Sequence, residues 1–149
     1  MFLDPRGPRS AAAVTTLVLI LVLVTGSGWL ALAQAAVFAA AAWNPRFSPY
    51  GLVYRAWVAP RLGRPTELEP AAPVRFAQLV GLLFLVVATA GYLGGVPVLG
   101  LVATACALAA AFLNAAFGLC LGCEAYLAIR RLRHRPVPAR VPAPSAGDS

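Results

Sequence analysis

The sequence is short of charged residues, and the few it has are mostly of one sign. Only 11% of its 149 residues are charged, against about 25% in ordinary soluble domains, and lysine is absent. With 60% hydrophobic residues and a mean hydropathy of +0.79, the chain is too apolar for a water-soluble globule and for a disordered basic tail. The composition therefore predicts one small membrane domain.

Chemically reactive residue types are scarce as well. Three cysteines, one histidine and five acidic residues are little material for a zinc fold or a disulfide scaffold. The sequence contains no Ser/His/Asp grouping, no P-loop and no G-x-G-x-x-G segment after a strand. We expect no cofactor and no resident metal ion. Whether the chain is an enzyme stays open, but we do not expect an independent enzymatic activity.

Two long stretches carry no charge, residues 10–43 and 76–123. A bilayer core needs about 20 helical residues to cross, so neither stretch suits one straight span. Each is interrupted by a turn-forming cluster, Gly-Ser-Gly at 26–28 and Gly-Gly-Val-Pro at 94–97. The pattern predicts an all-α membrane protein with four transmembrane helices, arranged as two hairpins, at about residues 10–25, 29–43, 76–93 and 98–129. Because the first two helices are short, a re-entrant first hairpin stays an alternative.

Five segments follow from this pattern. Residues 1–9 form an N-terminal segment, 10–43 the first hairpin, 44–75 a loop, 76–131 the second hairpin, and 132–149 a basic tail rich in proline and alanine. The start of the chain has features of a signal peptide, but its apolar stretch continues to Trp43, so we expect a retained helix. The tail lacks apolar periodicity and is predicted to be disordered.

The arginines determine the orientation. All twelve lie outside the predicted spans on one side of the four-helix arrangement, and the two hairpin turns carry none. The positive-inside rule puts that side, with both termini, in the cytoplasm, so we expect a multi-pass protein of the bacterial cytoplasmic membrane. Arginines that border membrane spans have lipid headgroups as their nearest anionic partner, and we do not expect a nucleic-acid partner.

The loop at 44–75 is rich in proline, arginine and aromatic residues. Its residues 50–58 favour a short interfacial helix, since aromatic residues and arginine suit the headgroup level. Four of its side chains are candidates for docking lipid or a cytosolic partner, although a plain solvated loop is the alternative: Arg55, Trp57, Arg61 and Arg64. Glu67 and Glu69 lie within reach of the last two of these arginines.

The stretch with the most chemistry is a C-x-x-C pair, Cys120 and Cys123, followed by Glu124. Three interpretations stay open: two small buried side chains, a redox or sulfur-carrying pair, or part of a metal site completed by a partner. If the last helix runs to about residue 129, its carbonyl end and Glu124 both oppose thiolate formation. A disulfide would distort such a helix, and the reducing cytoplasm favours a dithiol at rest.

Small residues recur near the same pair. At helical spacing, Asn114, Gly118 and Gly122 form one stripe, which is typical of close helix packing and would also suit a homo-oligomer. On the same predicted helix, Cys106 shares a face with the cysteine pair and Glu124.

Four motifs resemble one bacterial family. They are DPRGPR at 4–9, PRLGRP at 60–65, RFAQ at 75–78 and LNAAFGLCLGCEAY at 113–126, and together they are similar to the family called domain of unknown function 4395 over about residues 4–131. The resemblance implies a small integral membrane protein with a cysteine pair at the membrane end. It further implies an association with thioredoxin-like or sulfurtransferase-type proteins.

Three functional hypotheses follow. In the first, Cys120 and Cys123 exchange electrons or carry sulfur with a cytosolic partner, and Glu124 accepts protons. In the second, the chain is an assembly subunit that packs through its small-residue stripe and docks through its central loop. In the third, which has few polar residues in its favour, the chain carries a sulfur-containing anion with Cys106 and Cys120 as waypoints.

Overall fold

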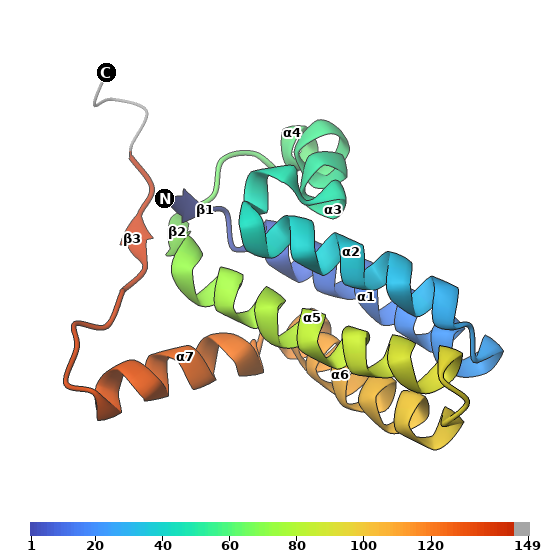
Figure 1. Ribbon diagram of the computed structural model, residues 1–149. Helices are drawn as coiled ribbons and strands as arrows, with labels where there is room; N and C mark the ends of the chain where they lie inside the picture. Colours follow the sequence, from blue (N-terminus) through green and yellow to red (C-terminus); the bar gives the residue numbers. More distant parts are fainter. Residues whose placement is uncertain (145–149) are drawn as a thin grey trace.

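The computed structural model describes residues 1–144, which are mostly helical (Figure 1). Four helices form a bundle: α1 (Arg6–Thr25), α2 (Gly28–Trp43), α5 (Ala71–Leu93) and α6 (Pro97–Phe117). Among the described residues, α1, α5 and α6 are the three helices long and apolar enough to cross a membrane, whereas α2 is apolar but has only 16 residues.

The two turns of the bundle fall at the glycine clusters. Gly26 ends α1 with a φ of +62°, and the Ser27 side chain then accepts a hydrogen bond from the backbone N–H of Leu30 to cap α2. The second turn uses Gly95, with a φ of +81°, and Pro97 begins α6. Local sequence therefore suffices to place both turns.

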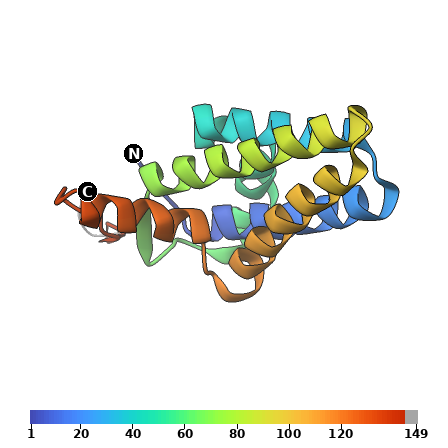
Figure 2. The same ribbon diagram turned by 60° about the horizontal axis from the view of Figure 1, so that its bottom comes forward.

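Each helix of the bundle packs against particular neighbours. α2 packs along α5, and α6 packs against both α1 and α5 (Figures 1 and 2). Its core combines large side chains such as Leu19 and Leu85, both fully buried, with small ones such as Ala31 that let the backbones approach. The outer faces are just as apolar, since Leu17 and Val98 are 64% and 69% exposed. An apolar exterior of this kind is typical of a protein surrounded by lipid.

The segment between the hairpins is largely helical. A short turn, η1 (Pro45–Phe47), leads into α3 (Pro49–Val53), η2 (Tyr54–Val58) and α4 (Ala59–Leu62). The backbone stays helical throughout residues 49–62, so the helix expected at 50–58 is present and longer than predicted. Ser48 caps it by accepting a hydrogen bond from the Gly51 N–H.

A small antiparallel sheet, which was not expected, lies at one end of the bundle. Its order is β1 (Phe2–Leu3), β2 (Glu67–Pro70) and β3 (Val141–Pro142). Arg140, beside β3, lies 3.9 Å from Glu67 and 3.5 Å from Glu69, in the place where Arg61 and Arg64 were expected.

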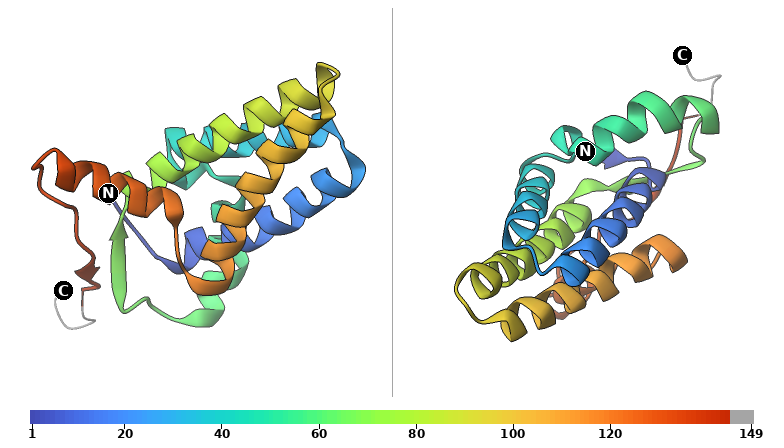
Figure 3. Two further views of the ribbon diagram at one scale, coloured as in Figure 1. Left: turned by 90° about the horizontal axis from the view of Figure 1, so that it is seen from below. Right: turned by 90° about the vertical axis from the view of Figure 1, so that its right-hand side faces the viewer.

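The sheet brings the N-terminal strand and the segment after α7 to the same end of the bundle. β3 differs from the disorder predicted for 132–149, and residues 145–149 of that segment lie outside the described residues. Figure 3 shows the N-terminal strand and β3 beside the same end of the bundle.

The predicted last helix, at about 98–129, is wrong, because the chain breaks it after Phe117. Gly118 adopts a φ of +68°, and its N–H bonds the carbonyl of Asn114 at 3.0 Å. The chain then turns and a separate helix, α7 (Leu121–Leu132), leaves the bundle (Figures 1 and 2). The guanidinium of Arg9 donates to the last carbonyls of α6, Ala115 and Ala116, each at 3.1 Å, and so stabilises the broken end.

Candidate functional site

The cysteine pair lies at the start of α7 rather than inside a helix. Cys120 is the N-cap residue, with extended φ and ψ of −87° and 98°, and its Sγ accepts a hydrogen bond from the Cys123 N–H at 3.3 Å. The two sulfurs are bonded, and the Cα atoms are 5.2 Å apart, a normal separation for a disulfide. The expected dithiol is therefore not what the structure holds. The extended N-cap residue lets the bond form without distorting a helical turn.

This position reverses the electrostatics expected from the sequence. A helix N-terminus carries a partial positive charge that stabilises an anion, so the start of α7 favours thiolate formation where a helix end would oppose it. Cys120 is half-buried, whereas Cys123 is only 6% exposed. The pair therefore has one sulfur-bearing residue open to attack and one held inside.

Glu124 follows in the first turn of α7, exposed to solvent. Within residues 1–144, Glu124 forms no ion pair. Acidic side chains are favoured in a first turn, and Arg130 and Arg131 complement the last turn. Glu124 therefore has a structural reason for its place and is also near enough in sequence to exchange protons with the pair.

The small residues do not form the predicted stripe. Asn114 lies on α6, Gly118 in the turn and Gly122 on α7. A Cβ on Gly122 would lie 2.6 Å from the Cα of Ala77 on α5, so this glycine is needed where α7 crosses α5 inside the same chain. The expectation that the three residues pack together against another helix is therefore corrected.

A cavity of about 660 Å³ extends from the cysteine pair into the bundle. It lies between α1, α2, α5, α6 and the start of α7, and both Cys120 and Cys123 line it. On α6 the lining runs from Cys106 to Phe117, which is about 16 Å of helix. Alanine, valine and phenylalanine provide most of its apolar lining, and polar side chains such as Thr15, Gln78 and Asn114 lie among them. Charged side chains also border it: Arg6, Arg9, Glu69 and Arg140.

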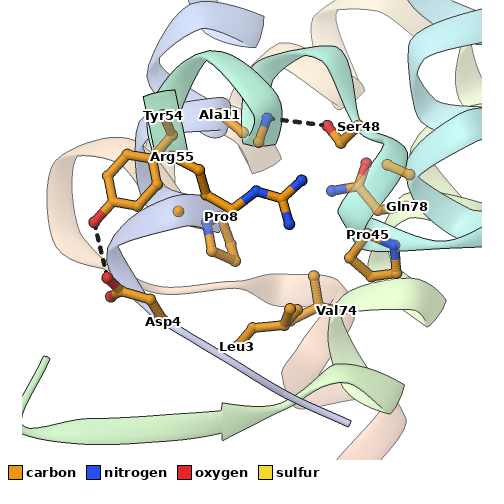
Figure 4. A pocket seen from close by; sticks show the side chains of 13 residues that line it. Leu3, Asp4, Pro8, Ala11, Pro45, Ser48, Tyr54, Arg55, Val74 and Gln78 are labelled. Atoms are coloured by element: carbon orange, nitrogen blue, oxygen red, sulfur yellow. Dashed lines mark hydrogen bonds between the residues drawn. The ribbon is translucent and has the colours of Figure 1, made fainter. Parts of the chain in front are cut away.

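A second cavity, of about 100 Å³, lies between the start of α1 and the central helical segment (Figure 4). The Tyr54 hydroxyl donates a hydrogen bond to the Asp4 carboxylate at 3.0 Å. Burial, with the hydrogen bond to Asp4 and its negative charge, raises the pKa of Tyr54 to about 12. Arg55 reaches across the cavity toward Gln78 in Figure 4 and donates to the Arg46 carbonyl.

Sequence reasoning missed a polar chain beside this region. The Tyr50 hydroxyl donates to the Gln34 side chain at 2.6 Å, and Gln34 in turn donates to Thr15 at 3.5 Å. Burial raises the pKa of Tyr50, while the bond to Gln34 acts in the opposite direction. Gln34 is 1% exposed, and a lone glutamine in an apolar run is a signal for such a partner.

Three of the predicted docking residues lie on the central helical segment, and Arg64 lies in the chain that follows it. Trp57 is 67% exposed, and Arg61 and Arg64 are exposed beside it, whereas Arg55 is engaged as described. None of the four lines the cavity at the cysteine pair. Over residues 1–144, no group of three histidine, cysteine or acidic side chains is arranged to hold a metal ion.

Similarity to known proteins gives the chain a family. No curated protein and no solved structure matches it. A family model with the description "Domain of unknown function (DUF4395)" matches residues 3–131, which include both hairpins and the cysteine pair. The chain therefore belongs to the DUF4395 family, as its four motifs suggested.

Proposed function

We propose that this chain is a membrane protein that exchanges disulfides, through Cys120 and Cys123, with a soluble protein partner. The observation that carries the proposal is the disulfide across the start of α7, with Cys120 as N-cap and Cys123 buried behind it. A helix N-terminus stabilises the thiolate that forms whenever the disulfide opens, and unequal burial gives the two sulfurs different tasks.

The exchange transfers two electrons. A thiolate of the partner attacks Cys120 Sγ, the bond to Cys123 breaks, and Cys123 leaves as a thiolate that takes up a proton. The second thiol of the partner loses its proton and attacks the partner's first sulfur, which is bonded to Cys120 in the mixed disulfide. Cys120 is then released. The partner dithiol becomes a disulfide and the Cys120–Cys123 disulfide becomes a dithiol, with Glu124 as an exposed carboxylate available for the protons.

The partner class follows from the same chemistry. A thioredoxin-like or sulfurtransferase-type protein presents a reactive cysteine on its surface, which is what the half-buried Cys120 requires. A sulfurtransferase could also leave its sulfane sulfur on Cys120 as a persulfide, and Cys123 would then release it as hydrosulfide by forming the disulfide. Trp57, Arg61 and Arg64 lie exposed on the central segment and supply a basic, aromatic docking surface for this partner or for lipid.

For the membrane arrangement we propose four crossings, with both ends of the chain in the bacterial cytoplasm. The 16 residues of α2 are about 24 Å long, a little short for a bilayer core, and the exposed Trp43 at its end suits the interface. The cysteine pair then lies at the cytoplasmic surface, within reach of soluble proteins.

Trapping tests the exchange. With Cys106→Ser as the parent, Cys123→Ser leaves Cys120 as the single thiol. A thioredoxin-like partner that lacks its second cysteine, supplied as a mixed disulfide with thionitrobenzoate, should then transfer to Cys120 with release of thionitrobenzoate and stay there in a long-lived adduct, because neither protein keeps the thiol that would resolve it. The adduct should run as a shifted band on a non-reducing gel and disappear on reduction. The matched variant Cys120→Ser should trap at least tenfold less, because Cys123 is buried. Equal trapping by the two variants, or trapping by neither, contradicts the proposal.

A carrier of a sulfur-containing anion is the second candidate, because Cys106 and Cys120 line one cavity. An assembly role without chemistry is the third, and its support is the exposed central segment. The double variant Cys120→Ser/Cys123→Ser separates them. A carrier should lose uptake of thiosulfate into vesicles in this variant, whereas an assembly function should be unchanged.

A further inference from the structure

Disulfide exchange at the protein surface does not require the cavity behind the cysteine pair. Exchange with a soluble protein needs only the rim, where Cys120 is half-buried. The cavity nevertheless continues from this rim along α6 to Cys106, for about 16 Å. Its volume of about 660 Å³ is in the range of sites for small organic ligands.

Two amide side chains in this cavity lack a partner within the chain. Gln78 on α5 and Asn114 on α6 both line it, and within residues 1–144 neither side chain forms a hydrogen bond with another group. Both residues are only partly buried, and Gln78 also borders the smaller cavity, so their amide groups are open to water or to a ligand with hydrogen-bond acceptors.

We propose that the cavity binds the ring of a membrane quinone, which reoxidises the Cys120–Cys123 dithiol. This inference rests on the proposed disulfide exchange and names the second substrate of the same site. A quinone ring is flat, apolar on both faces and carries two carbonyl oxygens that accept hydrogen bonds from amides such as Gln78 and Asn114. Alanine, valine and phenylalanine side chains provide the apolar walls.

The redox step balances with the quinone as the only co-reactant. The Cys120 thiolate attacks the ring, and attack of Cys123 Sγ on Cys120 Sγ then forms the disulfide and releases the electron pair to the ring. Two protons, one from each thiol, end on the two oxygens. Dithiol and quinone therefore give disulfide and hydroquinone, and the pair returns to the form that the structure holds.

The cavity lies where a membrane-dissolved oxidant can reach it. It lies among the halves of α1, α2, α5 and α6 nearest the cysteine pair and also borders Glu69 and Arg140 near the sheet, and the outer faces of these helices are apolar. A water-soluble oxidant has no need of a cavity of this depth. The other occupant of similar shape, a lipid acyl chain, has no acceptors for the amides and cannot take electrons, so the test distinguishes the two.

The experiment measures oxidation of the reduced protein by a quinone. The full chain, purified in detergent with Cys106→Ser as parent, is reduced, freed of reductant without oxygen, and mixed with ubiquinone-1. We expect one hydroquinone per disulfide formed, followed by ultraviolet absorbance and by loss of maleimide-reactive thiols. Cys120→Ser/Cys123→Ser should reduce none.

Two variants locate the reaction in the cavity. Ala110 lines the cavity and its neighbour Ala109 is exposed on the outside of α6. We expect Ala110→Phe to slow hydroquinone formation more than tenfold, while Ala109→Phe reacts like the parent. Because Ala110→Phe could fail to fold, Asn114→Leu, which keeps the shape and removes the amide, provides a second measurement and should raise the ubiquinone-1 concentration that gives the half-maximal rate at least fivefold.

The outcomes separate this inference from the proposed function. If a thioredoxin-like dithiol reduces the Cys120–Cys123 disulfide but ubiquinone-1 does not reoxidise it, the quinone site is overturned and disulfide exchange stands. Equal rates for Ala110→Phe and Ala109→Phe also overturn the site, and so does an unchanged half-maximal ubiquinone-1 concentration for Asn114→Leu. Both results are expected if only acyl chains occupy the cavity. If neither substrate reacts, the proposed function fails together with this inference.

Discussion

At the scale of single residues, the electrostatic environment of Cys120 depends on one backbone angle two positions earlier. In an unbroken helix Cys120 would lie near carbonyl groups that oppose a thiolate. Gly118, with a φ of +68°, ends that helix and makes Cys120 the first residue of another. The sequence predicts Cys120, Cys123 and Glu124 as the candidate chemical site, but the sign of the local field follows from a dihedral angle that residue types alone do not determine.

Tyr54 shows a different limit of residue-level reasoning. From the sequence, its aromatic ring is equally compatible with an interfacial position and with a place in a core. Its partner Asp4 is fifty positions away. Only the folded chain brings the start of α1 to the central segment. Once they meet, the hydroxyl of Tyr54, a residue that is 4% exposed, has a hydrogen-bond partner.

The pH dependence of stability tests this pair. The fold favours the neutral phenol of Tyr54. The phenol therefore contributes fully to the free energy of unfolding below its ordinary pKa of 10.0, and this contribution is lost as the pH rises toward about 12. Tyr54→Phe should cost about 1 kcal/mol of stability at pH 8, the value of one such bond. The deficit of the variant relative to the parent should shrink between pH 10 and pH 12 in thermal unfolding of the detergent-solubilised protein. A deficit that stays constant over that range contradicts the assignment.

At the scale of elements, the sequence predicts the hairpin turns well and the α6–α7 break not at all. Clusters such as Gly94, Gly95 and Pro97 disfavour a helix by themselves. Gly118 stands alone in an apolar run, where a single glycine is tolerated at about 1 kcal/mol. A residue far away in the sequence stabilises the break, because Arg9 donates hydrogen bonds to carbonyls at the end of α6.

The sheet was missed for a related reason. β1 and β3 have two residues each and β2 has four, too few for a period-two pattern to be recognised. Strands of this length are stable only where other elements hold them together, and here Arg140 and the two glutamates of β2 contribute to that.

Replacing Gly118 tests the break directly. Gly118→Ala places a Cβ at a φ of +68°, which costs about 1–2 kcal/mol for an L-residue, so we expect a lower unfolding temperature and slower trapping of a partner by Cys120. The matched control is Gly7→Ala at the start of α1, where a Cβ would make an ordinary 3.6 Å contact with Tyr54. If both variants behave like the parent, the α6–α7 turn is not needed in the form described.

At the scale of the whole molecule, one end of the bundle carries almost all of the polar chemistry. The start of α1, the central helical segment, the sheet and α7 gather there (Figures 1 and 3), together with the twelve arginines and the cysteine pair. The opposite end consists of the two uncharged turns. This asymmetry was readable in the sequence, because two antiparallel hairpins necessarily bring every other connection to the same end.

Labelling from each side of the membrane tests the orientation. In a background with all three cysteines replaced by serine, Ser27→Cys lies in the turn between α1 and α2, and Arg64→Cys lies in the exposed chain after α4. Positive-inside placement predicts that a membrane-impermeant maleimide modifies Ser27→Cys on intact spheroplasts, and Arg64→Cys only after permeabilisation. Because a four-span bundle puts both turns outside, Gly95→Cys should label like Ser27→Cys. If Gly95→Cys labels from outside while Ser27→Cys labels only from the cytoplasm, the first hairpin is re-entrant, α2 does not cross, and the cysteine pair keeps its cytoplasmic side with fewer spans than proposed.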